Sequence, residues 1–248
     1  MMDLGGNLDA NSVPAGNGWL WITHAWTLFL RQPGVWVLIF VLFTVIMVAL
    51  SLLGTVGTLA SALVIPILAG GFVLAARTAD QGGVPEITML FEGFREKAGP
   101  LAMLGVLNLA ALLVIGLVVG LIMGVGMGMG ALVGGMGGGG PGAMMGGMAG
   151  MSATALLGIL VAFALYLPVA AALWFAPALV MFRGIAPLDA ARESLAACLK
   201  NLVPLLVYGL AVMLLGTLAS IAFGLGWLAL GPVLGISVYT GYRDIFTG

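Results

Sequence analysis

Charged residues are scarce in this 248-residue chain, and their scarcity excludes a soluble globular protein. Asp, Glu, Lys and Arg make up 7% of the residues and hydrophobic residues 62%, whereas soluble domains carry about 25% charged residues. Eight basic and nine acidic residues give a net charge of -1, so no basic surface is available to bind nucleic acid. The single cysteine, Cys198, and single histidine, His24, exclude an internal disulfide and a histidine-cluster metal site.

Three long stretches have no charge at all: residues 32–76, 98–182 and 201–242, of 45, 85 and 42 residues. A helix of 42–45 residues is about 65 Å long, roughly twice the thickness of a bilayer core, so each short stretch predicts two crossings. The long stretch contains a Gly- and Met-rich segment, 124–150, which is predicted to be a loop between two further crossings. The sequence therefore predicts six transmembrane helices, at 34–53, 57–76, 101–123, 153–182, 203–223 and 227–242.

The basic residues predict the orientation in the membrane. With two crossings per stretch, all eight lysines and arginines lie on one side, and the positive-inside rule places both termini in the cytoplasm of a bacterial cell, with 124–150 in the periplasm. Residues 1–17 have no apolar core of a signal peptide, and their Gly, Asn, Asp and Pro content predicts a mobile cytoplasmic tail. Pro168 and Pro177 in the fourth span predict a tilt or a kink.

Three segments on the charged side follow one pattern: an amphipathic interfacial helix, a proline at the membrane entry and a helical hairpin. They are residues 18–77, 85–183 and 187–243, with entry prolines Pro33, Pro100 and Pro204. Because every segment crosses the membrane twice, the copies share one orientation and form parallel repeats.

A second spacing recurs in the hairpins, because eleven residues separate Pro66 from Arg77 and also Pro232 from Arg243; the middle copy is one helical turn longer. The alternative is that proline and arginine are simply common at membrane boundaries. The predicted fold class is an all-α integral membrane protein, in which 18–248 form a single six-span domain of three parallel repeats.

Short sequences along the chain resemble a known family. GWLW at 18–21, AWTLF at 25–29 and YRDIF at 242–246, with LYLP at 165–168 and WFAPAL at 174–179, resemble an uncharacterised family of proteobacterial six-span inner-membrane proteins. More loosely, the repeat is similar to the membrane domain of some glycerophosphodiester phosphodiesterases, whose catalytic domain has no counterpart in this sequence. The resemblance implies an inner-membrane location and a fold, but no activity. The Gly- and Met-rich segment departs from the family pattern.

Methionines crowd the segment 124–150, and thioethers suit soft ions such as Cu(I). The candidate metal ligands are Met127, Met129, Met136, Met144, Met145 and Met148. The alternative is an adaptable apolar connector, which the sequence favours because no His, Cys or acidic residue reinforces the methionines. No cofactor is predicted.

The predicted spans contain no Asp, Glu, Lys, Arg or His, which disfavours an ion-coupled transporter and an intramembrane enzyme. The polar residues that could line a solute path or join helices are Asn108, Tyr166, Tyr208 and Tyr239. The spacing of Gly116, Gly120 and Gly124 predicts close helix packing. Cys198 is expected to be an inert small apolar residue and His24 a solvated one.

The leading functional hypothesis is a non-enzymatic integral membrane protein that organises or assists partner proteins or lipids. Its interaction face would be the cytoplasmic collar of three amphipathic helices, and its partners the bilayer and a membrane protein or a second copy of the chain. The alternative is a channel or permease for an uncharged or lipid-like solute. A weaker alternative is copper handling by the methionine segment.

Overall fold

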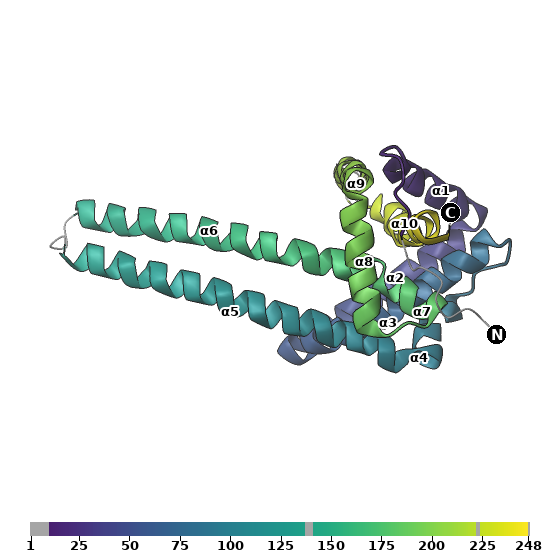
Figure 1. Cartoon of the computed structure of the whole chain (residues 1–248), viewed down its shortest axis with the longest axis horizontal. Helices are drawn as coiled ribbons and strands as arrows, with labels where there is room; N and C mark the ends of the chain where they lie inside the picture. Colours follow the sequence, from purple (N-terminus) through teal and green to yellow (C-terminus); the bar gives the residue numbers. More distant parts are fainter. Residues whose placement is uncertain (1–9, 137–140, 222–223, 248) are drawn as a thin grey trace. The chain divides into compact units, whose positions relative to one another are not determined.

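The computed structural model describes residues 10–136, 141–221 and 224–247, apart from the side chains at 127, 129–131, 133–136 and 141–152. In these ranges the chain is helical with short connections and contains no strand (Figure 1). The elements are α1 Asn17–Arg31, α2 Pro33–Ser51, α3 Gly54–Asp80, the 3-10 helix η1 Ile87–Phe91, α4 Glu92–Glu96, α5 Ala98–Met136, α6 Pro141–Trp174, α7 Ala176–Arg183, α8 Pro187–Lys200, α9 Leu202–Ile221 and α10 Trp227–Thr247.

Within the described residues, five stretches of helix are long and apolar enough to cross a membrane. They are Pro33–Ser51, Gly54–Asp80, Ala98–Gly126, Ala153–Arg183 and Leu202–Ile221, which correspond to the first five predicted spans. The all-helical, multi-pass architecture is therefore confirmed. The sixth predicted span, 227–242, falls within α10, a helix of 21 residues that is less apolar than the other five.

The chain divides into two compact units. Unit 1 comprises Met1–Val106 and Ala171–Gly248, and unit 2 comprises Leu107–Ala170. Unit 2 consists of parts of α5 and α6, which lie side by side (Figure 1). The structure differs here from the predicted loop at 124–150, because α5 continues to Met136 and α6 begins at Pro141. The Gly- and Met-rich segment thus extends the two helices beyond the candidate spans, which end at Gly126 and resume at Ala153.

The prediction of close helix packing at the spaced glycines of unit 2 is also wrong. A Cβ atom added at Gly116, Gly120 or Gly124 would meet no atom within 4 Å among the described residues. The close approach of α5 and α6 occurs instead at Gly126, where a Cβ would overlap the side chain of Thr154. A spacing of small residues thus marked the correct helix but the wrong face.

The predicted distortion of the fourth span occurs at its second proline. Helix α6 continues through Pro168 and ends at Trp174, and α7 begins at Ala176 with Pro177 in its first turn. The buried Ser194 hydroxyl stabilises the break, because it donates to the Ala171 carbonyl (2.6 Å) and accepts from the Phe175 N–H (3.0 Å). The two backbone groups freed by the break are thereby satisfied from α8.

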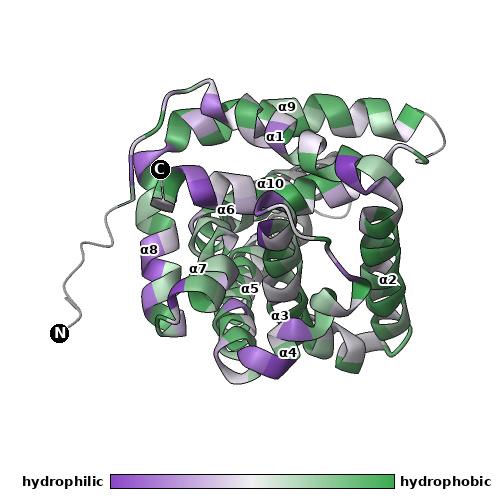
Figure 2. Ribbon diagram, turned by 90° about the vertical axis from the view of Figure 1, so that its right-hand side faces the viewer, coloured by the Kyte–Doolittle hydropathy of each residue, from purple (hydrophilic) through white to green (hydrophobic). Residues whose placement is uncertain are grey.

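Helices α3, α7 and α10 carry most of the core of unit 1, while α2 and α9 lie outside it. Ten residues of α3 and eleven of α10 are buried, against two of α2. Figure 2 shows that α2 and α9 are hydrophobic along most of their length. Their exposed side chains recur at helical spacing, as in Leu38, Val41, Val45 and Val48 of α2, which is typical of a face turned to lipid.

The amphipathic segments pack across the ends of the hairpins. Helix α1 contacts α9 and α10, η1 and α4 contact α3, and α8 contacts α7 and α9. The second segment is not the single regular helix that the periodicity predicts, since η1 is followed by the short α4. Two glycines allow its close approach: a Cβ at Gly71 would overlap the Leu90 carbonyl, and a Cβ at Gly93 would overlap the Ile67 carbonyl.

The predicted mobile tail is held in place from Ala10 onward, and residues 1–9 lie outside the described part. The side chain of Asn201 is 1% exposed, accepts from the Val13 N–H at 2.9 Å and donates to the Asn11 carbonyl at 2.9 Å. Lys200 Nζ donates to the Ala10 carbonyl at 2.6 Å. A buried amide needs partners for both its donor and its acceptor, and the segment 10–13 supplies them.

Candidate functional site

The arginines that mark the ends of the hairpins each contact the next hairpin around unit 1. Arg77 of α3 places its guanidinium 4.9 Å from the ring centre of Phe182 in α7. Arg183 of α7 lies 5.3 Å from the ring centre of Phe246 in α10 and donates to its carbonyl at 2.6 Å. These cation–π contacts connect α3 to α7 and α7 to α10.

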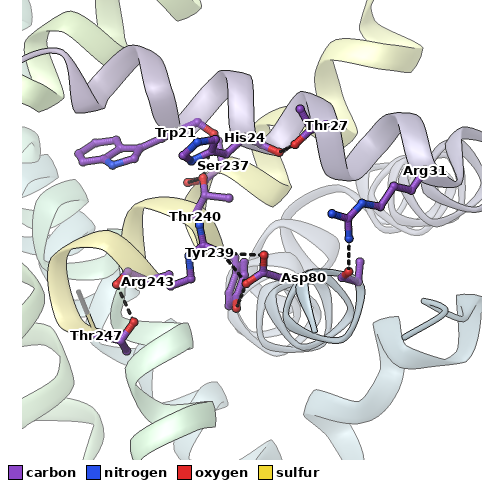
Figure 3. Close-up of polar contacts among 11 residues, drawn as sticks. Trp21, His24, Thr27, Arg31, Asp80, Ser237, Tyr239, Thr240, Arg243 and Thr247 are labelled. Carbon is purple, nitrogen blue, oxygen red and sulfur yellow. Dashed lines mark hydrogen bonds and ion pairs between the residues drawn. The ribbon is translucent and has the colours of Figure 1, made fainter. Parts of the chain in front are cut away.

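Arg243 of α10 closes the cycle by binding Asp80 at the end of α3 (Figure 3). Its Nη1 lies 2.6 Å from both carboxylate oxygens, and Tyr239 donates its hydroxyl to the same carboxylate at 2.9 Å. The side chain of Asp80 is 20% exposed and that of Arg243 is 41% exposed. The resulting ion pair is half-buried and joins the first hairpin to the last.

Asp244, the next residue of α10, anchors α1. It accepts hydrogen bonds from Asn17 Nδ2 and from Trp21 Nε1, each at 2.8 Å. One turn earlier, Thr240 donates to the Trp21 carbonyl at 2.8 Å (Figure 3). Trp21 is thus fixed at its backbone by Thr240 and at its ring by Asp244. The first amphipathic helix is thereby attached to α10, the last helix of the chain.

The single cysteine and histidine have contrasting environments. Cys198 is 2% exposed on the inner face of α8, and burial raises the pKa of its thiol to about 12, although a hydrogen bond with Ser194 acts in the opposite direction. A neutral, buried thiol is a poor nucleophile. His24 is exposed on α1, and its carbonyl accepts from Thr27.

A cavity of about 120 Å³ lies where α1 ends, α2 begins and α3 ends. Its lining includes Arg31, Gln32, Trp36, Gly82 and Gly83. Arg31 donates to the Ala79 carbonyl at 3.1 Å (Figure 3). Trp36 Nε1 and Gln32 Oε1 are both buried and have no hydrogen-bond partner among the described residues.

The residues predicted for a solute path or helix contacts fall in both units. Asn108 and Tyr166 belong to unit 2, where Asn108 Oδ1 is buried without a hydrogen-bond partner in the described part of the chain and Tyr166 is 42% exposed. Tyr208 and Tyr239 belong to unit 1, where they bond to Ser237 (2.8 Å) and to Asp80. Their predicted roles stay predictions. All six candidate methionines have side chains outside the described residues, so copper binding also stays a prediction.

The polar groups with the clearest structural roles were not among the predicted site residues. Segments far away in sequence form the surroundings of Trp36, Gln32 and Asn201. The only feature of the sequence that could have drawn attention to these positions was a polar residue near a membrane-entry proline. Within the described ranges no three His, Cys, Asp or Glu side chains are grouped to hold a metal. Arg77 and Arg183 contact aromatic rings and Arg243 binds Asp80, while Asp244 accepts hydrogen bonds from α1.

The fold and these contacts define a multi-pass α-helical membrane protein whose charged residues join its hairpins at one end. The chain is 33% identical over 227 residues to a protein of Burkholderia thailandensis described as a "probable inner membrane protein", and the match covers 92% of this chain and 82% of that protein. The chain belongs to the same family of bacterial inner-membrane proteins, which confirms the predicted location. No family model matches the chain, and no solved structure matches it.

Proposed function

We propose that the chain is a non-enzymatic inner-membrane protein that organises lipids or partner proteins on its charged side. The observation that carries this proposal is the collar, the set of bulky apolar side chains that the amphipathic helices leave exposed after packing on the hairpins. The collar comprises Trp19, Leu20, Trp26 and Leu30 of α1, Ile87, Phe91 and Phe94 of η1 and α4, and Leu188 and Leu199 of α8. Aromatic side chains in this position suit the headgroup level of a bilayer and the rim of a protein contact.

The proposal places six spans in the membrane, with both termini in the cytoplasm. The backbone N–H of Asn11 donates to the Ile245 carbonyl at 2.8 Å. This contact supports an even number of crossings between residues 11 and 245, of which α10 would be the sixth. All eight lysines and arginines then face the cytoplasm.

The cyclic contacts support the three-repeat organisation. The first hairpin contacts the second through Arg77, the second contacts the third through Arg183, and the third contacts the first through Arg243. The amphipathic segments follow the same rule, since α4 packs on α3, α8 on α7 and α1 on α10. Three copies of one repeat arranged around an axis would produce this pattern.

We also propose that the protein catalyses no reaction. Asp80, Asp244 and Arg183 are engaged in bonds that join helices. A general acid or base needs a proton that it can exchange with a substrate. Groups held in this way are better suited to fixing the position of the collar.

Topology is tested with alkaline phosphatase fusions. A fusion after Phe246 should be inactive and a fusion after Pro141 active, because the enzyme folds only in the periplasm. If α10 did not cross, the fusion after Phe246 would be active, and both the six-span and the repeat proposals would fail.

The collar is tested by extracting the full chain from its own membrane in polymer-bounded nanodiscs and identifying the proteins and lipids that come with it. Trp26→Ser and Phe94→Ser remove collar aromatics. Phe163→Ser removes an aromatic that is 64% exposed on α6 and serves as the matched control. We expect a defined partner or lipid set to be lost from the collar variants and kept by the control. Identical contents in all variants would refute the role of the collar.

A further inference from the structure

The cavity beside Trp36 combines features of a built site for a polar group. Trp36 is 0% exposed, its indole ring packs on Phe72 with ring centres 5.6 Å apart, and its Nε1 has no hydrogen-bond partner in the described part of the chain. A buried donor without a partner is costly and rare in a folded protein. The donor therefore indicates a bound acceptor, supplied from outside the chain.

The other polar groups of the cavity define the ligand. Arg31 contributes a cation at the rim, with one guanidinium nitrogen held by the Ala79 carbonyl. Gln32 contributes a buried carbonyl oxygen without a partner in the described residues. Arginine and indole N–H groups together suit a phosphate oxygen, whereas the amide oxygen needs a donor, such as an ammonium group.

The size and the position of the cavity favour a lipid over a free ion. One buried water needs roughly 10–15 Å³ of such space, so about 120 Å³ admits a group of several non-hydrogen atoms. The cavity lies between Gln32, which directly precedes the span Pro33–Ser51, and Gly82, which follows the end of the span Gly54–Asp80. Both span ends mark the level at which lipid phosphates lie.

We propose that this cavity binds the phosphoethanolamine headgroup of a membrane lipid. The phosphate accepts hydrogen bonds from Trp36 Nε1 and from the Arg31 guanidinium, and the ammonium group donates to Gln32 Oε1. The inference deepens the lipid side of the proposed function and rests on it. It concerns a different set of residues from the collar.

The test is native mass spectrometry of the delipidated full chain with dioleoylphosphatidylethanolamine or dioleoylphosphatidylcholine. The wild type should bind the ethanolamine lipid about 10-fold more tightly than the choline lipid, since the trimethylammonium group of choline has no N–H to donate to Gln32 Oε1. Trp36→Phe keeps the ring and removes the N–H, and should weaken binding of the ethanolamine lipid about 10-fold. Trp227→Phe is the matched control, because Trp227 already donates to Ser220 at 3.1 Å.

Gln32→Leu provides a second variant at a half-exposed position that should fold even if Trp36→Phe does not. It should remove the preference for ethanolamine over choline while both lipids still bind. Equal binding by Trp36→Phe and Trp227→Phe, or an unchanged preference in Gln32→Leu, would overturn the proposal. Displacement of the lipid by inorganic phosphate would assign the cavity to a free phosphate instead. A failure here would leave the collar result unaffected, because the collar variants retain the cavity.

Discussion

The ion pair between Asp80 and Arg243 should couple the first hairpin to the last with a measurable free energy. Exposed ion pairs contribute about 0–1 kcal/mol to stability, and breaking a fully buried pair costs about 3–5 kcal/mol. With side chains 20% and 41% exposed and both oxygens 2.6 Å from Nη1, the pair lies between these limits. We expect a coupling free energy of about 1–2 kcal/mol, or a 5–30-fold change in the unfolding equilibrium.

The assay is a double-mutant cycle of Asp80→Asn and Arg243→Gln, measured by SDS-induced unfolding in mixed micelles. The cycle cancels what each substitution does alone, including its effect on the helix dipole. The matched control is the cycle of Asp189→Asn and Arg192→Gln, since that pair is 3.5 Å apart with side chains 59% and 71% exposed. Its coupling should stay below about 0.5 kcal/mol. Equal couplings in the two cycles would refute the claim that Asp80 and Arg243 hold the hairpins together.

Three further outcomes follow from single residues. Cys198 should react with N-ethylmaleimide at least about 10-fold more slowly in the folded protein than in SDS at pH 8. Folding raises the pKa of its thiol from 9.0 to about 12. The free energy of unfolding that the neutral thiol contributes should therefore fall as the pH rises from about 9 toward 12. Asn201→Ala should expose residues 10–13 to limited proteolysis and cost about 1–3 kcal/mol; unchanged cleavage would show that the tail is held by other contacts. Gly71→Ala should lower the melting temperature in detergent, since its Cβ overlaps the Leu90 carbonyl, whereas Gly116→Ala, which meets open space, should be neutral.

The sequence predicted those features that depend on local composition. The charge-free stretch 32–76 predicted the hairpin of α2 and α3 because its length alone allows two crossings, and Pro177 predicted the break before α7. The recurring distance from Pro66 to Arg77 and from Pro232 to Arg243 located two of the three arginines of the cycle. Each of these signals lies within one element or one hairpin, where chain length and backbone chemistry decide the outcome.

Partners could not be predicted in the same way, because they are chosen by the packing of distant segments. Nothing near Arg243 in sequence indicates that it binds Asp80, and nothing near Asn201 indicates that residues 10–13 will cover it. The glycines at 116, 120 and 124 illustrate the same limit. Their spacing reports that a helix could approach closely, but the approaching helix contacts Gly126 instead.

If α10 is the sixth span, as we propose, its polar residues explain why it is less apolar than the other five. Hydropathy measures how well a helix tolerates lipid on all sides, but eleven residues of α10 are buried by other helices. A shielded helix can carry Ser237, Tyr239 and Thr240, since each finds a hydrogen-bond partner within the protein. These residues lower the hydropathy of α10 and also connect it to α9, α3 and α1. The same polar residues that lower the hydropathy of α10 therefore fix its place among the other helices, as expected of an inner helix of a bundle.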